Sequence, residues 1–170
     1  MSKLLILKNP KFYIKFFTTF ALFISNIIFA NNNITAFSNS FTFDNKTGIG
    51  TYSGNVVVSD DTKELFANTI KVYRTKSGEI NKIVAKGSPA RFFDKSKKDD
   101  IASGHAEMIT YLKIKNLVIL EKDATLNNQN NTLKAPKIIY NTKTQIAKTL
   151  SSDSQSKKGR TKIVLSNIKD

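Results

Sequence analysis

Short runs in which hydrophobic and polar residues alternate fill most of the chain after residue 33. The runs are rich in Val, Ile, Thr, Phe and Tyr, and clusters of Gly, Asn, Asp, Ser and Lys separate them, a pattern typical of β-strands joined by turns. Apolar residues at helical spacing are hard to find after Ala30. The pattern therefore predicts an all-β sandwich, jelly roll or meander, with strands at residues 51–58, 65–73, 80–85, 90–93, 101–112, 117–126, 133–140, 145–150 and 161–165.

A repeated motif, Ala-x-x-Ile-x-Val/Tyr, occurs at residues 67–72, 106–111 and 135–140. Its Ala and Ile are three positions apart, so in a regular strand they would point to opposite faces. A bulge or corner between them would return both to one interior, as where a strand bends from one sheet into a facing one. We therefore expect bent strands. Residues 34–36 and 41–43 form a degenerate first copy of the repeat, and Pro89 and Pro136 mark further bends or edges.

The first thirty residues have a different character. Four lysines precede an apolar stretch from Phe16 to Ala30, and no acidic residue occurs before Asp44. A basic start, a short apolar core and a small final residue are typical of a secretory signal peptide, whereas a membrane anchor usually needs about 20 apolar residues. We expect cleavage after Ala30, leaving residues 31–170 as a single domain in a periplasm-like compartment.

Charge and composition exclude several classes of function. The chain has 27 Lys+Arg against 13 Asp+Glu, but four of the positive charges belong to the predicted leader. Export would separate the protein from nucleic acid, so we expect no nucleic-acid partner. With no Cys and a single histidine, His105, the chain cannot build disulfides, thiolate nucleophiles or a multi-histidine metal site. No acid, base and nucleophile converge in the sequence, so we expect neither an enzyme nor a cofactor.

Several segments in a fixed order carry a resemblance to a known family. They are Tyr52–Val58, the Ala-x-x-Ile-x-Tyr repeats, Lys86–Phe93, Gly104–Ala106 and Lys158–Thr161. With the signal peptide, they make the chain similar to the OstA-like family of periplasmic lipopolysaccharide-transport proteins, from about Ile34 to Ser166. One departure is Glu121–Ala124, where the family often has Gly-Asn before a strand.

The resemblance implies an open, twisted β-jelly roll of repeated antiparallel strands, with an apolar groove for the acyl chains of lipid A. It also implies a bridge stacked head to tail between an LptC-like inner-membrane protein and an LptD-like outer-membrane translocon. Inward-facing alternate residues would line the groove, although a closed core needs the same pattern. The predicted groove residues are Ile34, Ala36, Phe41, Phe43, Leu65, Ile70, Val72, Phe92, Ile109, Tyr111, Ile138 and Tyr140; among these, Ile34, Phe92 and Tyr111 match family positions that contact lipid.

The resemblance further implies that the two ends of the roll pair with other copies. The donor edge would be residues 161–165, in particular Thr161, Ile163 and Leu165, and the acceptor edge residues 34–38. An open edge that pairs without closing produces filaments. Two loop clusters, with Lys95, Lys97 and Lys98 in one and Lys157, Lys158 and Arg160 in the other, either meet lipid A phosphates or are simply solvated.

Two other functions remain open on the sequence alone. One is an LptC-like, membrane-anchored partner, which would keep its N-terminal segment. The other is a basic periplasmic module that binds polyanions or serves as a scaffold. Binding of lipopolysaccharide that depends on Phe92 or Tyr111 would separate the bridge protein from the scaffold.

Overall fold

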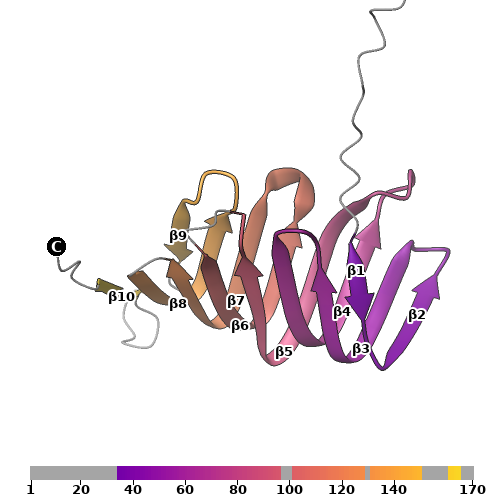
Figure 1. Cartoon of the computed structure of the whole chain (residues 1–170), viewed down its shortest axis with the longest axis horizontal. Coiled ribbons are helices and arrows are strands. Elements are labelled where there is room, and N and C mark those ends of the chain that lie inside the picture. The colour runs from indigo at the N-terminus through magenta and orange to yellow at the C-terminus, as the bar shows by residue number, and fades with distance from the viewer. Residues whose placement is uncertain (1–33, 97–100, 129–130, 151–160, 166–170) are drawn as a thin grey trace, which may run out of the picture. The chain divides into compact units, whose positions relative to one another are not determined.

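The computed structural model describes residues 34–96, 101–128, 131–150 and 161–165, and almost all of them lie in β-strands (Figure 1). The predicted all-β fold is therefore confirmed. The leader predicted for residues 1–30 lies outside this part of the chain. The strands are β1 (Thr35–Phe37), β2 (Ser40–Asp44), β3 (Ile49–Ser59), β4 (Lys63–Arg74), β5 (Ile80–Asp94), β6 (Ala102–Leu112), β7 (Leu117–Asn128), β8 (Asn131–Asn141), β9 (Ala147–Leu150) and β10 (Lys162–Leu165), with one 3-10 turn, η1 (Lys113–Lys115).

The ten strands of the described residues belong to one antiparallel sheet, eight of them in the order β1-β3-β4-β5-β6-β7-β8-β10. Strand β2 also pairs with β3, and β9 also pairs with β8. Neighbours in the sheet are mostly neighbours in sequence, because short turns join strands that run back and forth. In the turn after β4, Gly78 has a φ of 87°, a backbone conformation that glycine adopts without a steric penalty.

The long strands bend along one line across the sheet. The pairing register shifts in every adjacent pair from β3 to β8, between Ser53 and Val56 in β3, Phe66 and Thr69 in β4, Lys86 and Ala90 in β5, His105 and Met108 in β6, and Glu121 and Ala124 in β7. Figure 1 shows the strands curving at this line, so that two layers face each other. We call this line the corner line. It confirms the bend predicted from the Ala-x-x-Ile spacing.

One strand differs from the prediction. Residues 80–85 and 90–93 belong to the single strand β5, which crosses the corner line through Gly87 and a cis Ser88–Pro89 bond. A side chain at Gly87 would place its Cβ 2.7 Å from the backbone nitrogen of Ala90, so glycine is needed for this bend. Pro136 in β8 also lies at the corner line, outside every paired position, and its missing N–H therefore costs no ladder hydrogen bond.

The corner line divides the folded sheet into two layers. The first layer contains β1, β10 and the parts of β3 to β8 between them; the second contains β2, β9 and the remaining parts. The side of each layer that lies away from the corner line carries the hairpin turns, and we call it the open edge. The core lies between the layers and includes fully buried Ile70, Ile109, Leu120 and Ile138.

Candidate functional site

Three rows of inward-facing side chains run along the interior from one end of the roll to the other. Directly paired residues on neighbouring strands share a face, so the registers define each row. Two rows lie in the second layer and one in the first. The row nearer the corner line is Phe41, Tyr52, Ile70, Ala85, Ile109, Leu120, Ile138 and Thr149; the row nearer the open edge is Phe43, Gly50, Val72, Ile83, Tyr111, Val118, Tyr140 and Ala147; the row of the first layer is Ala36, Val58, Leu65, Phe92, Gly104, Leu126, Leu133 and Ile163.

The twelve predicted groove residues belong to this interior but differ in burial. Most are buried, namely Leu65, Ile70, Val72, Phe92, Ile109, Ile138 and Tyr140. Ile34, Ala36 and Tyr111 are partly buried against the core. Phe41 and Phe43 are 55% and 45% exposed, because their strand, β2, ends the layer and has no further neighbour among the described strands. They still face inward, since the Phe41 ring lies 4.6 Å from that of Tyr52.

Sequence reasoning missed several members of the rows. Val58, Ile83, Val118, Leu120 and Leu126 are buried in the interior alongside the predicted residues. The signal that could have found them is alternation within their own strands, because buried apolar residues there lie two positions apart, namely Val56 and Val58, Ile83 and Ala85, Val118 and Leu120, and Ala124 and Leu126. Gly104 was also overlooked as part of the interior row.

The layers contact each other through apolar side chains. The rings of Phe92 in the first layer and Tyr140 in the second lie 6.3 Å apart between their centroids. Gly104 makes this contact possible, because a Cβ at that position would lie 2.5 Å from Cε1 of Phe92 and 2.8 Å from the carbonyl oxygen of Thr125. The interior is therefore close-packed in its middle. A hollow of about 320 Å³ lies at the β2 end, lined by Phe41, Phe43, Tyr52 and Val72. Further room lies near the open edge.

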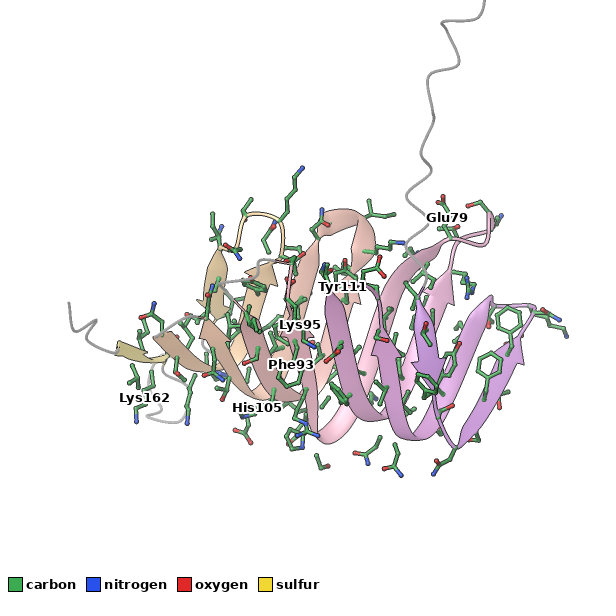
Figure 2. All side chains as sticks on the ribbon, in the orientation of Figure 1. Glu79, Phe93, Lys95, His105, Tyr111 and Lys162 are labelled. Carbon is green, nitrogen blue, oxygen red and sulfur yellow. The ribbon has the colours of Figure 1, made fainter. Side chains whose placement is uncertain are left out.

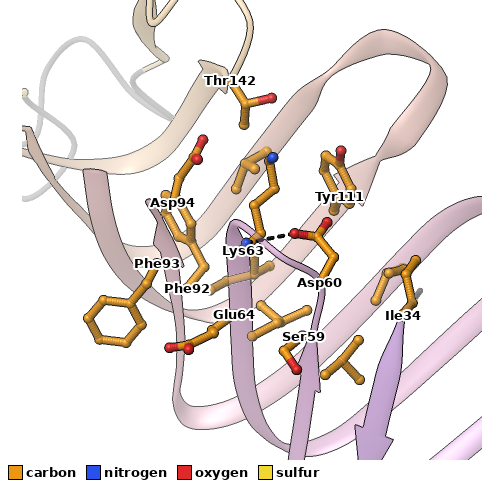
Figure 3. Close-up of a pocket in the computed structure, with 15 residues that line it drawn as sticks. Ile34, Ser59, Asp60, Lys63, Glu64, Phe92, Phe93, Asp94, Tyr111 and Thr142 are labelled. Carbon is orange, nitrogen blue, oxygen red and sulfur yellow. Dashed lines mark hydrogen bonds between the residues drawn. The ribbon is translucent and has the colours of Figure 1, made fainter. Parts of the chain in front are cut away.

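That room is a narrow cavity of about 50 Å³ between the layers (Figure 3). Its apolar wall includes Ile34, Leu65, Phe92, Ile109 and Val118. A buried water needs roughly 10–15 Å³, so the cavity has space for only a few waters. An acyl chain therefore needs more space than the two layers leave between them here.

Polar side chains surround the mouth of this cavity. Asp60, Lys63 and Asp94 come from the first layer, and Tyr111 and Thr142 from the second. Asp60 is fixed in its turn, because Oδ1 accepts hydrogen bonds from the backbone N–H groups of Thr62 and Lys63 at 2.8 and 2.7 Å. Figure 2 places Tyr111 toward the open edge and His105 toward the corner line.

The hydroxyl of Tyr111 stays protonated in this setting. Burial raises the pKa of Tyr111 above its usual value, and the negative charges of Asp60 and Asp94 raise it further. A raised pKa means that the neutral phenol is favoured at every pH below the ordinary pKa near 10. Tyr111 can therefore both donate and accept a hydrogen bond at the mouth of the cavity.

Exposed apolar side chains gather at the two ends of the roll. Phe37, Phe41 and Phe43 lie on β1 and β2, while Leu150, Ile163 and Val164 lie on β9 and β10. The predicted edge residues Thr161, Ile163 and Leu165 lie at or within β10, which pairs only with β8 among the described strands. The Thr161 hydroxyl donates to that of Thr149 at 2.8 Å, which joins β10 to β9 at the corner line.

The lysine clusters are described only in part. Lys95 forms an ion pair with Glu64, with Nζ 2.8 Å from Oε1, and both side chains are partly exposed. Lys97, Lys98, Lys157, Lys158 and Arg160 lie outside the described residues. In the part of the chain that is described, no group of three or more His, Cys, Asp or Glu could hold a metal ion. Within the same residues, no helix has the length and apolar character to cross a membrane.

Comparison with known proteins gives consistent matches. A family model described as LptA/(LptD N-terminal domain) LPS transport protein matches residues 34–146. The lipopolysaccharide export system protein LptH of Pseudomonas aeruginosa is 32% identical over 110 residues, which is 64% of this chain and 63% of that protein. The lipopolysaccharide export system protein LptA of Escherichia coli K12 is 30% identical over 135 residues, or 78% of this chain and 71% of that protein.

A solved structure shares the fold. It is the crystal structure of LptH, described as the LptA-homologous periplasmic component of the conserved lipopolysaccharide transport device of Pseudomonas aeruginosa. The match has a TM-score of 0.73 at 28% identity and covers 80% of this chain and 96% of that one. The implied β-jelly roll of repeated antiparallel strands is thereby confirmed.

Proposed function

The chain belongs to the LptA/LptD N-terminal-domain family of LPS transport proteins. On that premise, we propose that it is a periplasmic bridge protein that carries lipopolysaccharide from the inner to the outer membrane. The observation that supports this most directly is the continuity of the three inward rows. They present an apolar path along the whole roll, and the path is uncovered at both ends, at Phe41 and Phe43 and at Ile163.

Carrying a lipid across water requires burial of its acyl chains and no covalent chemistry. Each methylene removed from water contributes about 0.8 kcal/mol, so several acyl chains need a long apolar surface. The interior rows offer that surface, and we assign the protein no catalytic step. The polar mouth of the cavity would then face the head of the lipid while the acyl chains lie between the layers.

Lipid entry in this proposal requires the two layers to move apart. The cavity of about 50 Å³ is far smaller than even one acyl chain. In the described part of the chain, the two layers are covalently connected only where the chain crosses the corner line. The turns at the open edge join strands within the same layer, so they do not connect one layer to the other. Opening at the open edge therefore separates apolar side chains such as Phe92 and Tyr140 and leaves the strand ladders intact.

The strand directions support head-to-tail stacking. Strand β1 runs from the open edge to the corner line, whereas β10 runs from the corner line to the open edge. In the second layer, β2 runs from the corner line to the open edge and β9 runs from the open edge to the corner line, so these two strands are also antiparallel to each other. A second copy placed end to end would thus add antiparallel pairs to both layers and keep the interior continuous.

The two ends of such a stack would meet different partners. We propose that the β1–β2 end faces an LptC-like inner-membrane protein and that the β9–β10 end faces an LptD-like outer-membrane translocon. Both contacts would use the same exposed strand edges and apolar side chains as the contact between copies.

The test is retention of lipopolysaccharide by the purified protein, with Tyr111→Asp compared with Thr110→Asp. Tyr111 faces the cavity, and Thr110 lies next to it on the outward face of the same strand. A charge beside an acyl chain costs binding energy, so we expect Tyr111→Asp to retain at least about tenfold less lipid and Thr110→Asp to match the wild type. A wild-type protein that retains no lipopolysaccharide, or equal retention by a folded Tyr111→Asp variant, would contradict the proposal.

A further inference from the structure

In the first layer, the inward-facing side chains change from apolar to polar close to the open edge. Two positions beyond the apolar residues Val58, Leu65, Phe92 and Leu126, the same face carries Asp60, Lys63, Asp94 and Asn128. Because the spacing is two, these side chains point into the same interior as the apolar row. We call these four residues the polar rim.

Asp94 is the unusual member of the polar rim. Its side chain is only 2% exposed, and it lines the cavity (Figure 3). Oδ1 accepts hydrogen bonds from the backbone N–H and the hydroxyl of Ser96. The second oxygen, Oδ2, is buried and has no hydrogen-bond partner. None of the ion pairs in the described part of the chain includes Asp94.

A buried carboxylate oxygen without a donor is costly and needs an explanation. Nearly all buried polar atoms in folded proteins are hydrogen-bonded, and an unpaired charged group loses more free energy than a neutral one. Asn128, two strands away on the polar rim, likewise has a buried and unpartnered side-chain oxygen. Two such acceptors in one row, facing one interior, indicate that donors arrive from a ligand.

The chemistry of the ligand follows from the chemistry of the acceptor. An ionised carboxylate only accepts hydrogen bonds, so it cannot pair with a phosphate and repels it. Its natural partners here are hydroxyl or amide N–H groups at the point where an acyl chain joins a polar head. The tip of Lys63 lies on the same side of the cavity as Asp94 and Tyr111 (Figure 3), and it offers a positive charge for a more distant anionic group.

We propose that Asp94 Oδ2 accepts a hydrogen bond from a hydroxyl or amide N–H at the head end of a bound glycolipid's acyl chain, so that the polar rim sets how deeply the lipid sits between the layers. This inference rests on the proposed function, because it concerns the same interior. It adds a specific polar contact with the lipid to a site whose interior rows are mostly apolar.

The test measures binding of purified lipopolysaccharide to the full exported protein carrying Asp94→Asn. This variant keeps Oδ1 for Ser96 and replaces Oδ2 with an amino group, so the turn is preserved while the acceptor is lost. We expect binding about tenfold weaker than that of the wild type, as for loss of a charge-assisted hydrogen bond. Plain electrostatics predicts the opposite sign, because removing a negative charge should strengthen binding of a polyanionic lipid.

The matched control is Asp61→Asn, which makes the same charge change at an exposed carboxylate outside the cavity. We expect it to bind at least as tightly as the wild type. A second variant, Asp94→Glu, keeps the charge but displaces the carboxylate, and we expect it to weaken binding several-fold. Binding by folded Asp94→Asn that equals or exceeds that of the wild type would overturn the inference. Absence of binding by the wild type would instead overturn the proposed function.

Discussion

At the scale of single residues, Gly104 determines how closely the two layers approach. It lies in the apolar row of the first layer, beside Phe92 and beneath Leu120 of the second. Any Cβ there would come within 2.8 Å of the carbonyl oxygen of Thr125, an atom that cannot move without disturbing the ladder. The missing side chain is therefore what allows the Phe92 ring to fill the interior.

We predict that Gly104→Ala destabilises the fold by about 1–3 kcal/mol, because overpacking forces neighbouring side chains and backbone to shift. The free energy of unfolding in urea measures the change. Ser103→Ala, at the adjacent outward position, is the control and should differ from the wild type by less than about 0.5 kcal/mol. A urea midpoint for Gly104→Ala equal to that of the wild type would contradict this prediction, because it would show that the layers can accommodate a methyl group at this position.

The residues of the polar rim show what sequence alone could not reveal. Asp94 follows Phe92 by two positions, so the alternation of side chains along a strand predicts that the Asp94 side chain faces inward. This alternation does not predict that Asp94 is buried, because its burial depends on whether the second layer covers this part of the first layer near the open edge. The side-chain geometry of Asp94, and with it the unpartnered oxygen, requires the three-dimensional structure.

At the scale of elements, the strands were largely predictable. The alternation located most strands to within a few residues, and the three-residue spacing from Ala67 to Ile70 predicted the corner line. The exceptions have physical causes. The turn-forming residues Gly87 and Pro89 indicated a break in β5, whereas the strand continues through them. Phe41 and Phe43 have the pattern of core residues, but burial at the end of a sheet requires a neighbouring strand, and the described part of the chain provides none beside β2.

Continuity of the rows between copies gives a prediction about the edges. If the interior continues through a head-to-tail contact, Ile163 of β10 lies opposite Ala36 of β1 in the next copy, since both belong to the first-layer row. The chain has no natural cysteine. We therefore expect that mixing the Ala36→Cys and Ile163→Cys variants under mild oxidation yields a disulfide-linked dimer on a non-reducing gel.

The control for this prediction places the β1 cysteine at position 35 instead of position 36. Thr35 lies on the outward face of β1, so its side chain points away from Ile163 of a neighbouring copy. A mixture of Thr35→Cys and Ile163→Cys should form little dimer. Equal yields from both mixtures would mean that the ends associate without the proposed register.

At the scale of the whole molecule, the fold joins an apolar interior to two ends whose outer strands have no further partner among the described residues. A single sheet that bends once gives every long strand a place in both layers, so the interior rows extend as far as strands are added. The same construction leaves β1, β2, β9 and β10 as edges with exposed apolar side chains. The proposed lipid carriage and end-to-end assembly would therefore both use one architecture, and neither would require a separate site.

The central claim is that lipopolysaccharide travels between the two layers. Site-specific photocrosslinking tests it most directly, with a photoreactive phenylalanine analogue replacing either Tyr111 or Tyr73 in cells that export the protein. Both tyrosines are partly buried in the second layer, but Tyr111 faces the interior and Tyr73 the outer face. We predict a lipopolysaccharide adduct at position 111 and none at position 73. An adduct at 73 with none at 111 would contradict the account.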